Sequence, residues 1–336
     1  MLATALRTLL RLAEFPYCWA MQVRNHRYDN QSAAIDRVSV PVISVGNLTL
    51  GGTGKTPLVQ WIARRQSQQG LRVAIVSRGY GAWADGVNDE ALELQLALPD
   101  VPHQQDRDRV AAARAVIKQH QAQLIVLDDG FQHRRLARDL DIVLLDATEP
   151  FGFEHVFPRG TLREPLTSLA RADVVALSRA DMLDPAARSQ ARERVEQISP
   201  AAIWCEVVHG PSELTNTRGE TQPLSALAGK RVAAFSGIGN PAGFRHTLFS
   251  LDCQPIAWRE FPDHHRYSAA DIASLADWAT GADLALCTRK DLVKLDNATL
   301  GEVPLWAVNV ELRFLSGQES LEATIDELTK NSDLGN

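Results

Sequence analysis

The sequence predicts an α/β protein with a parallel sheet, a second, smaller α/β domain toward the C-terminus, and an amphipathic N-terminal helix. Short runs of valine, isoleucine and leucine alternate with helical stretches, a pattern typical of strands buried on both faces of a parallel sheet. A glycine-rich turn follows the first run, and a polar, turn-rich stretch divides the pattern in two. The length of 336 residues fits about two domains.

The composition is that of a folded globular chain. Hydrophobic residues make up 45% and charged residues 23%, which excludes a disordered or low-complexity protein. The net charge of −6 argues against a dedicated nucleic-acid binder, so we expect no nucleic-acid partner. The four cysteines are dispersed and form no CxxC pair, which predicts neither a disulfide scaffold nor a structural zinc site.

The N-terminal segment predicts an amphipathic helix. Its apolar face consists of Leu2, Leu6, Leu9 and Ala13, with Leu10 and Leu12 at the margins. The opposite face consists of Arg7, Arg11 and Glu14. Placing the two arginines at the centre of a bilayer would cost about 5–7 kcal/mol, whereas five leucines return only about 1.5–3 kcal/mol, so the helix is not expected to span a membrane.

We expect this segment to lie at a membrane surface. Pro16 is expected to interrupt the helix, and Tyr17 and Trp19 are suited to anchor it at the interface. The net charge of +3 over the first 28 residues favours anionic lipid. An amphipathic helix packed on the protein's own core is the alternative, which periodicity alone does not distinguish.

Apolar runs and helical spacing give the remaining elements in order. Strands are expected at Val40–Val45, Val73–Ser77, Leu124–Asp128, Ile142–Asp146 and Val174–Ser178, and helices at Lys55–Gln69, Val110–His120 and Ala186–Ile198. After a boundary at His209–Gly229, strands are expected at Arg231–Phe235, Pro255–Trp258, Leu284–Cys287 and Leu305–Val310, and helices at Ala242–Leu251 and Ala269–Thr280. The expected organisation is a membrane-associating segment over 1–28, a phosphate-binding domain over 29–208 and a smaller domain over 209–336.

The strongest chemical signal is a phosphate-binding loop between the first expected strand and helix. Its residues are Thr49, Leu50, Gly51, Gly52, Thr53, Gly54, Lys55 and Thr56. Glycines let several backbone N–H groups face one phosphate, and the helix N-terminus adds its positive end. In the motif GxxxxGK[ST], the lysine reaches the β/γ-phosphates and the hydroxyl ligates Mg²⁺, roles that fall to Lys55 and Thr56. Thr49 stands where the full motif has glycine.

Carboxylates at the ends of neighbouring strands are the candidates for holding the metal. Asp128 and Asp129 end one apolar run, and Asp146, a weaker candidate, ends the next. Farther along, Arg163 and Glu164 lie in a proline-bounded turn, where charge stabilisation and metal binding compete with a surface ion pair. Asp263, His264 and His265 could be metal ligands, although no further ligand is spaced to join them, and a base or base-orienting histidine is the alternative use.

Seven segments together resemble one family. They are Val45-Gly46-Asn47, Gly51–Pro57, Ser77-Arg78-Gly79-Tyr80-Gly81, Asp128-Asp129-Gly130-Phe131-Gln132-His133, Leu162-Arg163-Glu164-Pro165, Phe261-Pro262-Asp263-His264 and Thr288-Arg289-Lys290-Asp291. In this order they resemble the tetraacyldisaccharide 4′-kinases. The N-terminal helix is similar to that family's membrane-associating segment.

The resemblance implies a P-loop fold with a smaller C-terminal domain that closes over the active site. It also implies ATP and Mg²⁺ as cofactors and transfer of the γ-phosphoryl group to the 4′-hydroxyl of tetraacyldisaccharide 1-phosphate, giving lipid IVA in lipid A biosynthesis. The implied partners are a membrane-embedded glycolipid and, peripherally, the cytoplasmic face of the bacterial inner membrane. We expect no obligate protein partner.

Residue roles follow from the same resemblance. Asp128, Asp129, Arg163 and Glu164 match family positions at the metal–phosphate centre, with Lys55 and Thr56 in the loop roles given above. Asp89 corresponds to a base that accepts the proton of the 4′-hydroxyl, and His264 to a histidine that orients Asp89 and tunes its pKa. The family's Gly-Asp-Glu-Pro motif reads Asn88-Asp89-Glu90-Ala91 here, so both flanks of the acidic pair differ.

Two other classes compete with this interpretation. A P-loop GTPase that acts on a protein partner is suggested by Thr288-Arg289-Lys290-Asp291 and Ser178-Arg179-Ala180-Asp181, which faintly resemble guanine-reading segments. A soluble kinase of a small metabolite would use the same loop without depending on lipid or on residues 1–28.

Overall fold

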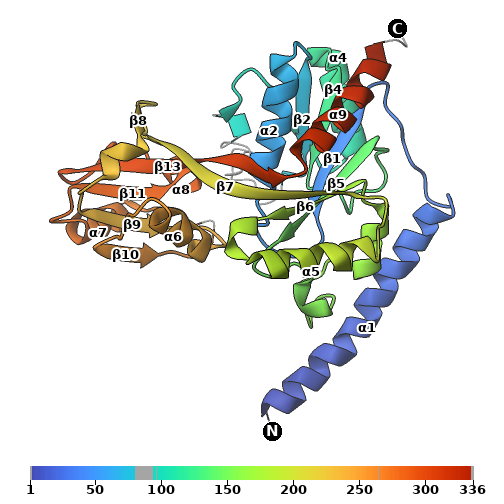
Figure 1. The fold of residues 1–336 in the computed structure, drawn as a ribbon, viewed down its shortest axis with the longest axis horizontal. Helices are drawn as coiled ribbons and strands as arrows, with labels where there is room; N and C mark the ends of the chain where they lie inside the picture. The colour runs from blue at the N-terminus through green and yellow to red at the C-terminus, as the bar shows by residue number, and fades with distance from the viewer. Residues whose placement is uncertain (1, 80–93, 96, 264, 334–336) are drawn as a thin grey trace. The chain divides into compact units, whose positions relative to one another are not determined.

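A computed structural model describes residues 2–79, 94–95, 97–263 and 265–333 (Figure 1). The chain divides into two compact units. Unit 1 comprises Met1–Tyr80, Leu98–Val208 and Arg313–Asn336, and unit 2 comprises Gly81–Ala97 and His209–Leu312. We describe each unit by itself.

Unit 1 is built on a parallel sheet, which confirms the predicted fold class. Its strands, in spatial order, are β3 (His103–Gln105), β2 (Val73–Ser77), β4 (Leu124–Asp128), β1 (Val42–Asn47), β5 (Leu140–Asp146), β6 (Val174–Ser178) and the first part of β7 (Ile203–Thr215). Val45 on β1 lies opposite Asp128 on β4 and Ile142 on β5. Because parallel strands share one carboxyl edge, this register brings the loop after β1 and the carboxylates after β4 to the same edge of the sheet.

Helices and short 3₁₀ turns cover this sheet. They are α1 (Leu2–Asp29), α2 (Lys55–Gln68), α4 (Arg109–His120), η1 (Gly152–Glu154), η2 (Leu166–Arg171), η3 (Ala180–Met182), α5 (Pro185–Glu196) and α9 (Gln318–Asp333). Aspartates cap the N-termini of two of them. The side chain of Asp108, just before α4, accepts the N–H groups of Val110 and Ala111. The side chain of Asp184, just before α5, accepts the N–H of Ala187. The helix α2 packs against β1, β2 and β4, directly behind the loop that it follows.

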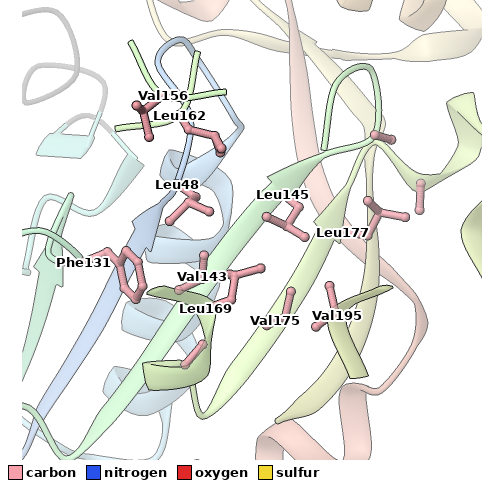
Figure 2. Packing of buried hydrophobic residues seen from close by; sticks show 13 residues of the cluster. Leu48, Phe131, Val143, Leu145, Val156, Leu162, Leu169, Val175, Leu177 and Val195 are labelled. Carbon is pink, nitrogen blue, oxygen red and sulfur yellow. The ribbon is translucent and has the colours of Figure 1, made fainter. Parts of the chain in front are cut away.

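A buried apolar cluster lies beneath the carboxyl edge of the sheet. Figure 2 shows Val143 and Leu145 of β5 beside Val175 and Leu177 of β6, alternate residues whose side chains share one face of the sheet. Leu48, immediately after β1, belongs to the same fully buried cluster. The backbone from which the phosphate loop rises is therefore fixed by close packing.

Unit 2 contains a smaller parallel sheet in the order β10 (Ala257–Glu260), β9 (Val232–Ser236), β11 (Leu284–Thr288) and β13 (Val303–Ser316). Its helical elements are η4 (Leu224–Leu227), α6 (Pro241–Phe249), α7 (Ala269–Trp278) and α8 (Arg289–Leu292). Two short antiparallel strands complete it, β8 (Thr221–Pro223) against β7 and β12 (Thr299–Leu300) against β13.

The division expected between residues 208 and 209 coincides with the boundary between the units, but two other features of the expected organisation differ. Residues 209–215, expected as the start of a turn-rich boundary, continue β7 as a strand. Residues 313–336, expected in the second domain, belong to unit 1. The strand β13 ends at Ser316, and the helix α9 that follows it packs on α2. In that contact Arg65 of α2 donates two hydrogen bonds to Asp326, at 2.5 and 2.9 Å.

The expected interruption at Pro16 is also wrong. The helix α1 runs unbroken from Leu2 to Asp29 through that proline (Figure 1). Proline removes one N–H from the helix, but contacts on either side of Pro16 hold α1 against the rest of unit 1. Glu14 pairs with Arg159 at 3.1 Å, and the hydroxyl of Tyr17 donates to the carbonyl of Arg163 at 2.9 Å. Among the residues that the structure describes, no helix has both the length and the apolar content that crossing a bilayer requires.

Candidate active site

The phosphate loop turns through backbone conformations that its glycines allow. Gly51 has φ +109° and Gly54, the residue before α2, has φ +79°, values in the left-handed region that side chains rarely adopt. Thr49 and Thr53 are buried, whereas Leu50 is 46% exposed. The side-chain amide of Asn47 donates to the carbonyl of Thr49 at 2.7 Å and fixes the start of the loop.

Lys55 lies at the centre of a charged cluster. Its Nζ is 3.1 Å from Oδ1 of Asn47 and 3.3 Å from Oδ1 of Asp129. Arg163 Nη1 donates to both oxygens of Asp129, at 2.9 and 3.0 Å. Burial alone would raise the pKa of Asp129, but the charges of Lys55 and Arg163 outweigh burial and lower that pKa below its ordinary value. Asp129 is therefore a carboxylate that holds two cations beside the phosphate loop.

Close backbone packing brings Arg163 and Gln132 to this cluster. The N–H of Arg163 donates to the carbonyl of Leu48 at 2.7 Å, and the amide of Gln132 donates to the carbonyl of Asn47 at 3.0 Å. A Cβ at Gly46 would meet the Cβ of Phe131 at 2.5 Å, so only glycine allows the segment before Gln132 to approach β1 this closely.

Arg109 is a charged neighbour that we did not single out from the sequence. It is 5% exposed at the start of α4, and burial lowers its pKa, as does the charge of Arg78, while Asp129 and Asp128 act in the opposite direction. Burial and the charges of Arg109 and Arg138 lower the pKa of His133 to about 4. His133 is therefore neutral at pH 7. The sequence signal was the Asp106-Arg107-Asp108-Arg109 run, which looks like an ordinary charged surface turn.

The candidate metal ligands differ in their surroundings. Asp128 is buried at the end of β4 and Thr56 is buried in the first turn of α2. Asp146, the weaker candidate, instead pairs with Arg179, whose other nitrogen donates to the carbonyl of Gly52 at 3.0 Å. Ser178 likewise donates to the carbonyl of Thr53 at 2.7 Å. The Ser178–Asp181 segment thus supports the phosphate loop.

Glu164 is bonded to side chains of both η2 and α1. Its side chain is fully buried, and Arg171 donates to both carboxylate oxygens, at 3.2 and 3.0 Å. Asn25 of α1 donates to the same carboxylate at 2.7 Å. With its oxygens bonded in this way, Glu164 ties α1 to η2.

In unit 2, the segment that resembles a guanine reader serves the unit's own fold. Asp291 is fully buried, and its oxygens accept the hydroxyls of Tyr267 at 2.8 Å and Thr288 at 2.6 Å and the N–H of Gly237 at 2.9 Å. Among the described residues, no group of three or more His, Cys, Asp or Glu side chains is arranged so that it could hold a metal ion. Asp89 and His264, the expected base and its partner, lie outside the described residues.

Comparison with known proteins places the chain in a family. Residues 6–330 match the family model described as LpxK, tetraacyldisaccharide-1-P 4′-kinase. A tetraacyldisaccharide 4′-kinase of Anaeromyxobacter sp. (strain K) is 41% identical over 94% of this chain and 89% of its own length. The corresponding protein of Syntrophus aciditrophicus is 36% identical over 96% and 93%.

A solved structure agrees with the sequence comparison. LpxK from Aquifex aeolicus, crystallised in complex with ATP, superposes with a TM-score of 0.76 at 30% identity, covering 96% of this chain and 99% of that one. At this identity and coverage, the likeness extends well beyond a shared P-loop core. The chain belongs to the tetraacyldisaccharide 4′-kinase family.

Proposed function

We propose that this protein transfers the γ-phosphoryl group of ATP to the 4′-hydroxyl of tetraacyldisaccharide 1-phosphate, a step of lipid A biosynthesis. The convergence of Lys55 and Arg163 on Asp129 beside the phosphate loop carries the proposal. Family membership supplies the substrate, since the relatives are tetraacyldisaccharide 4′-kinases.

The chemistry asked of this site is mainly positioning and charge neutralisation, because phosphoryl transfer leaves little covalent chemistry for the protein to perform. In the proposed reaction the N–H groups of the loop and Lys55 hold the β- and γ-phosphates. Arg163 neutralises charge on the γ-oxygens, and Asp129 keeps both cations oriented. Arg109, buried nearby, adds a further positive charge.

The donors present fit Mg²⁺. This ion takes oxygen ligands in an octahedron and usually binds through one or two carboxylates, substrate phosphates and waters. Thr56 and Asp128, both buried near the loop, would hold it. Mg²⁺ held by these residues would supply positive charge that offsets the negative charge developing in the transition state. A dedicated cage of carboxylates is not needed, and Glu164 is better assigned to its contacts with Arg171 and Asn25.

The family resemblance supports Asp89 as the base and His264 as the residue that orients it. Replacing Asp89 by alanine is then expected to lower kcat about 10²–10⁴-fold while leaving ATP affinity nearly unchanged, because proton abstraction is needed only in the transition state. Steady-state kinetics and equilibrium ATP binding measure the two effects. An unaltered kcat would remove Asp89 from this role.

We further propose that α1 holds the protein peripherally at the cytoplasmic face of the inner membrane, where the acyl chains of the substrate lie. Its outer face exposes an apolar stripe at helical spacing, consisting of Leu12 (62% exposed), Phe15 (65%), Trp19 (67%) and Val23 (40%). Tyr17, expected as an anchor, instead points toward the rest of unit 1, where its hydroxyl donates to the carbonyl of Arg163. The stripe lies about a third of a turn from the expected Leu2–Ala13 face.

A micelle assay tests the proposed reaction. Tetraacyldisaccharide 1-phosphate in detergent is incubated with Mg²⁺ and ATP labelled in the γ-phosphate, and the lipid is extracted. Label is expected in a bis-phosphorylated lipid. Release of labelled phosphate without lipid labelling would contradict the proposal and favour an NTPase. Labelling of a water-soluble acceptor alone would favour a metabolite kinase.

A further inference from the structure

The half-buried face of α1, here called its inner face, contacts residues of the candidate site at several points. We call the charged cluster of Lys55, Asp129 and Arg163 the phosphate centre. The residues of α1 that are half-buried recur at helical spacing and are Leu10, Glu14, Tyr17, Cys18, Met21, Arg24, Asn25 and Tyr28. They lie on the side of the helix opposite the apolar stripe, as 100° per residue places them. The helix therefore has one face available to lipid and another that packs on the rest of unit 1.

Three side chains of this inner face bond to residues of the candidate site. Tyr17 donates to the carbonyl of Arg163 at 2.9 Å, and Arg24 donates to the carbonyl of Gln132. Asn25 donates to Glu164, the neighbour of Arg163, at 2.7 Å and to Ser168 at 3.3 Å. Each contact fixes backbone or a buried carboxylate directly beside a group at the phosphate centre.

The two residues held in this way meet at the charged cluster. Arg163 binds both oxygens of Asp129 and lies 3.4 Å from Oε1 of Gln132, and Gln132 donates to the backbone of Asn47. Since Asn47 also accepts from Lys55, the path from α1 to the phosphate-binding lysine is one of direct contacts. Reciprocal contacts from Arg134, which donates to the carbonyl of Asn25 at 3.0 Å and pairs with Asp29 at 2.7 Å, hold the helix in register.

We propose that Tyr17, Arg24 and Asn25 are positioning residues for phosphoryl transfer: docking of the inner face of α1 sets the backbone of Arg163 and Gln132. The inference deepens the proposed function and rests on it, because Arg163 is assigned to the γ-phosphate there. It gives α1 a role that a membrane anchor alone would not have. A misplacement of about 1 Å at such a site costs roughly 10²-fold in rate, so loss of these contacts is measurable.

The test uses the full-length protein and single substitutions on α1. Tyr17→Phe removes one hydroxyl and leaves the ring against Phe157, whose centroid is 5.9 Å away. Asn25→Ala removes the contacts with Glu164 and Ser168. Gln22→Ala, at an exposed position of the same helix, is the matched control. For each protein we would measure kcat, the KM for micellar lipid, partition onto anionic vesicles and the thermal unfolding midpoint.

The expected result is a fall in kcat of threefold or more for Tyr17→Phe and Asn25→Ala, with lipid KM and vesicle partition unchanged. Gln22→Ala should match the wild type. A smaller fall in kcat, or one accompanied by weaker vesicle partition, would overturn the proposal, because α1 would then act only as an anchor or not at all. Tyr17→Phe keeps the test informative even if Asn25→Ala unfolds.

Failure of the proposed function is distinguished by the wild type and by nucleotide binding. If the wild type labels no lipid, the proposed function is wrong, whatever the variants do. The positioning role is then tested by the dissociation constants of ADP and of a non-hydrolysable ATP analogue. A threefold or greater weakening of the analogue relative to ADP in Tyr17→Phe would support it, and an unchanged ratio would overturn it.

Discussion

Asp129 is bonded to both cations of the phosphate centre, so its charge sets their positions. Asp129→Asn would leave Lys55 and Arg163 without a counter-charge, and we expect kcat to fall about 10²–10³-fold, the usual scale for losing one preorganised electrostatic group. Nucleotide affinity should change less than kcat. Asp139→Asn is the control, because it removes the same charge from a pair with Arg37 elsewhere in unit 1. Parallel kinetics that show equal, small losses in both variants would argue against this role.

His133 makes stability depend on pH. Its pKa falls from 6.5 to about 4 on folding, so the unfolded chain binds more protons between these values. Its contribution to stability is complete above pH 6.5 and is lost as the pH falls toward 4. The loss of unfolding free energy between pH 7 and pH 4 should be smaller by roughly 2–3 kcal/mol in His133→Gln than in the wild type.

Denaturant titrations at the two pH values measure this difference. His120→Gln is the matched control, since His120 is exposed at the end of α4. An equal loss in His133→Gln and in the wild type would mean that His133 titrates normally in the folded protein.

At the scale of single elements, α1 shows why periodicity alone was insufficient. The sequence indicated an amphipathic helix, but it did not indicate that the helix continues through Pro16 or that Phe15, Trp19 and Val23 are exposed along it. The contacts of Tyr17 and Asn25 that fix the rotation of the helix are with residues about 140 positions away, and no local pattern contains them.

The outer stripe of α1 leads to a prediction about membrane binding. Replacing Trp19 by serine should weaken partition onto anionic vesicles about tenfold or more, because burying one large aromatic side chain is worth roughly 1.5–3 kcal/mol. Sedimentation with vesicles measures the effect. Ala20→Ser, an exposed change next to it, should leave partition unaltered. Unchanged partition of Trp19→Ser would show that this stripe is not the lipid-facing surface.

At the scale of the whole molecule, the strands and the phosphate loop were predictable because their signals are local. The strands Leu124–Asp128 and Val174–Ser178 and the helix after Gly54 lie where the apolar runs and glycines placed them. The burial of Arg109 and the contact of Glu164 with Asn25 were not predictable, because packing between residues far apart in the sequence decides both. The return of the chain end to unit 1 likewise depends on contacts between α2 and α9.

The contact between Arg65 of α2 and Asp326 of α9 leads to a prediction about stability. Hydrogen bonds from Arg65 lower the pKa of Asp326 to about 2, so the pair stabilises the folded protein above pH 4 and is lost as the pH falls through 2. Since both side chains are partly exposed, Asp326→Asn should cost only about 1 kcal/mol at pH 7. Glu327→Gln, an exposed change on the same helix, is the control. Equal chemical denaturation midpoints for the two variants would mean that the Arg65–Asp326 pair contributes nothing to the free energy of unfolding.

The central claim is that the Lys55 centre phosphorylates the lipid disaccharide itself. Mass spectrometry of the lipid recovered from wild-type protein and from Lys55→Ala, each incubated with Mg²⁺-ATP in micelles, tests it most directly. We predict one added phosphate for the wild type, located by fragmentation on the sugar that bears the 4′-hydroxyl, with one ADP formed per product and at least a 10²-fold loss in the variant. An unmodified lipid with ATP consumed, or equal product from both proteins, would contradict the account.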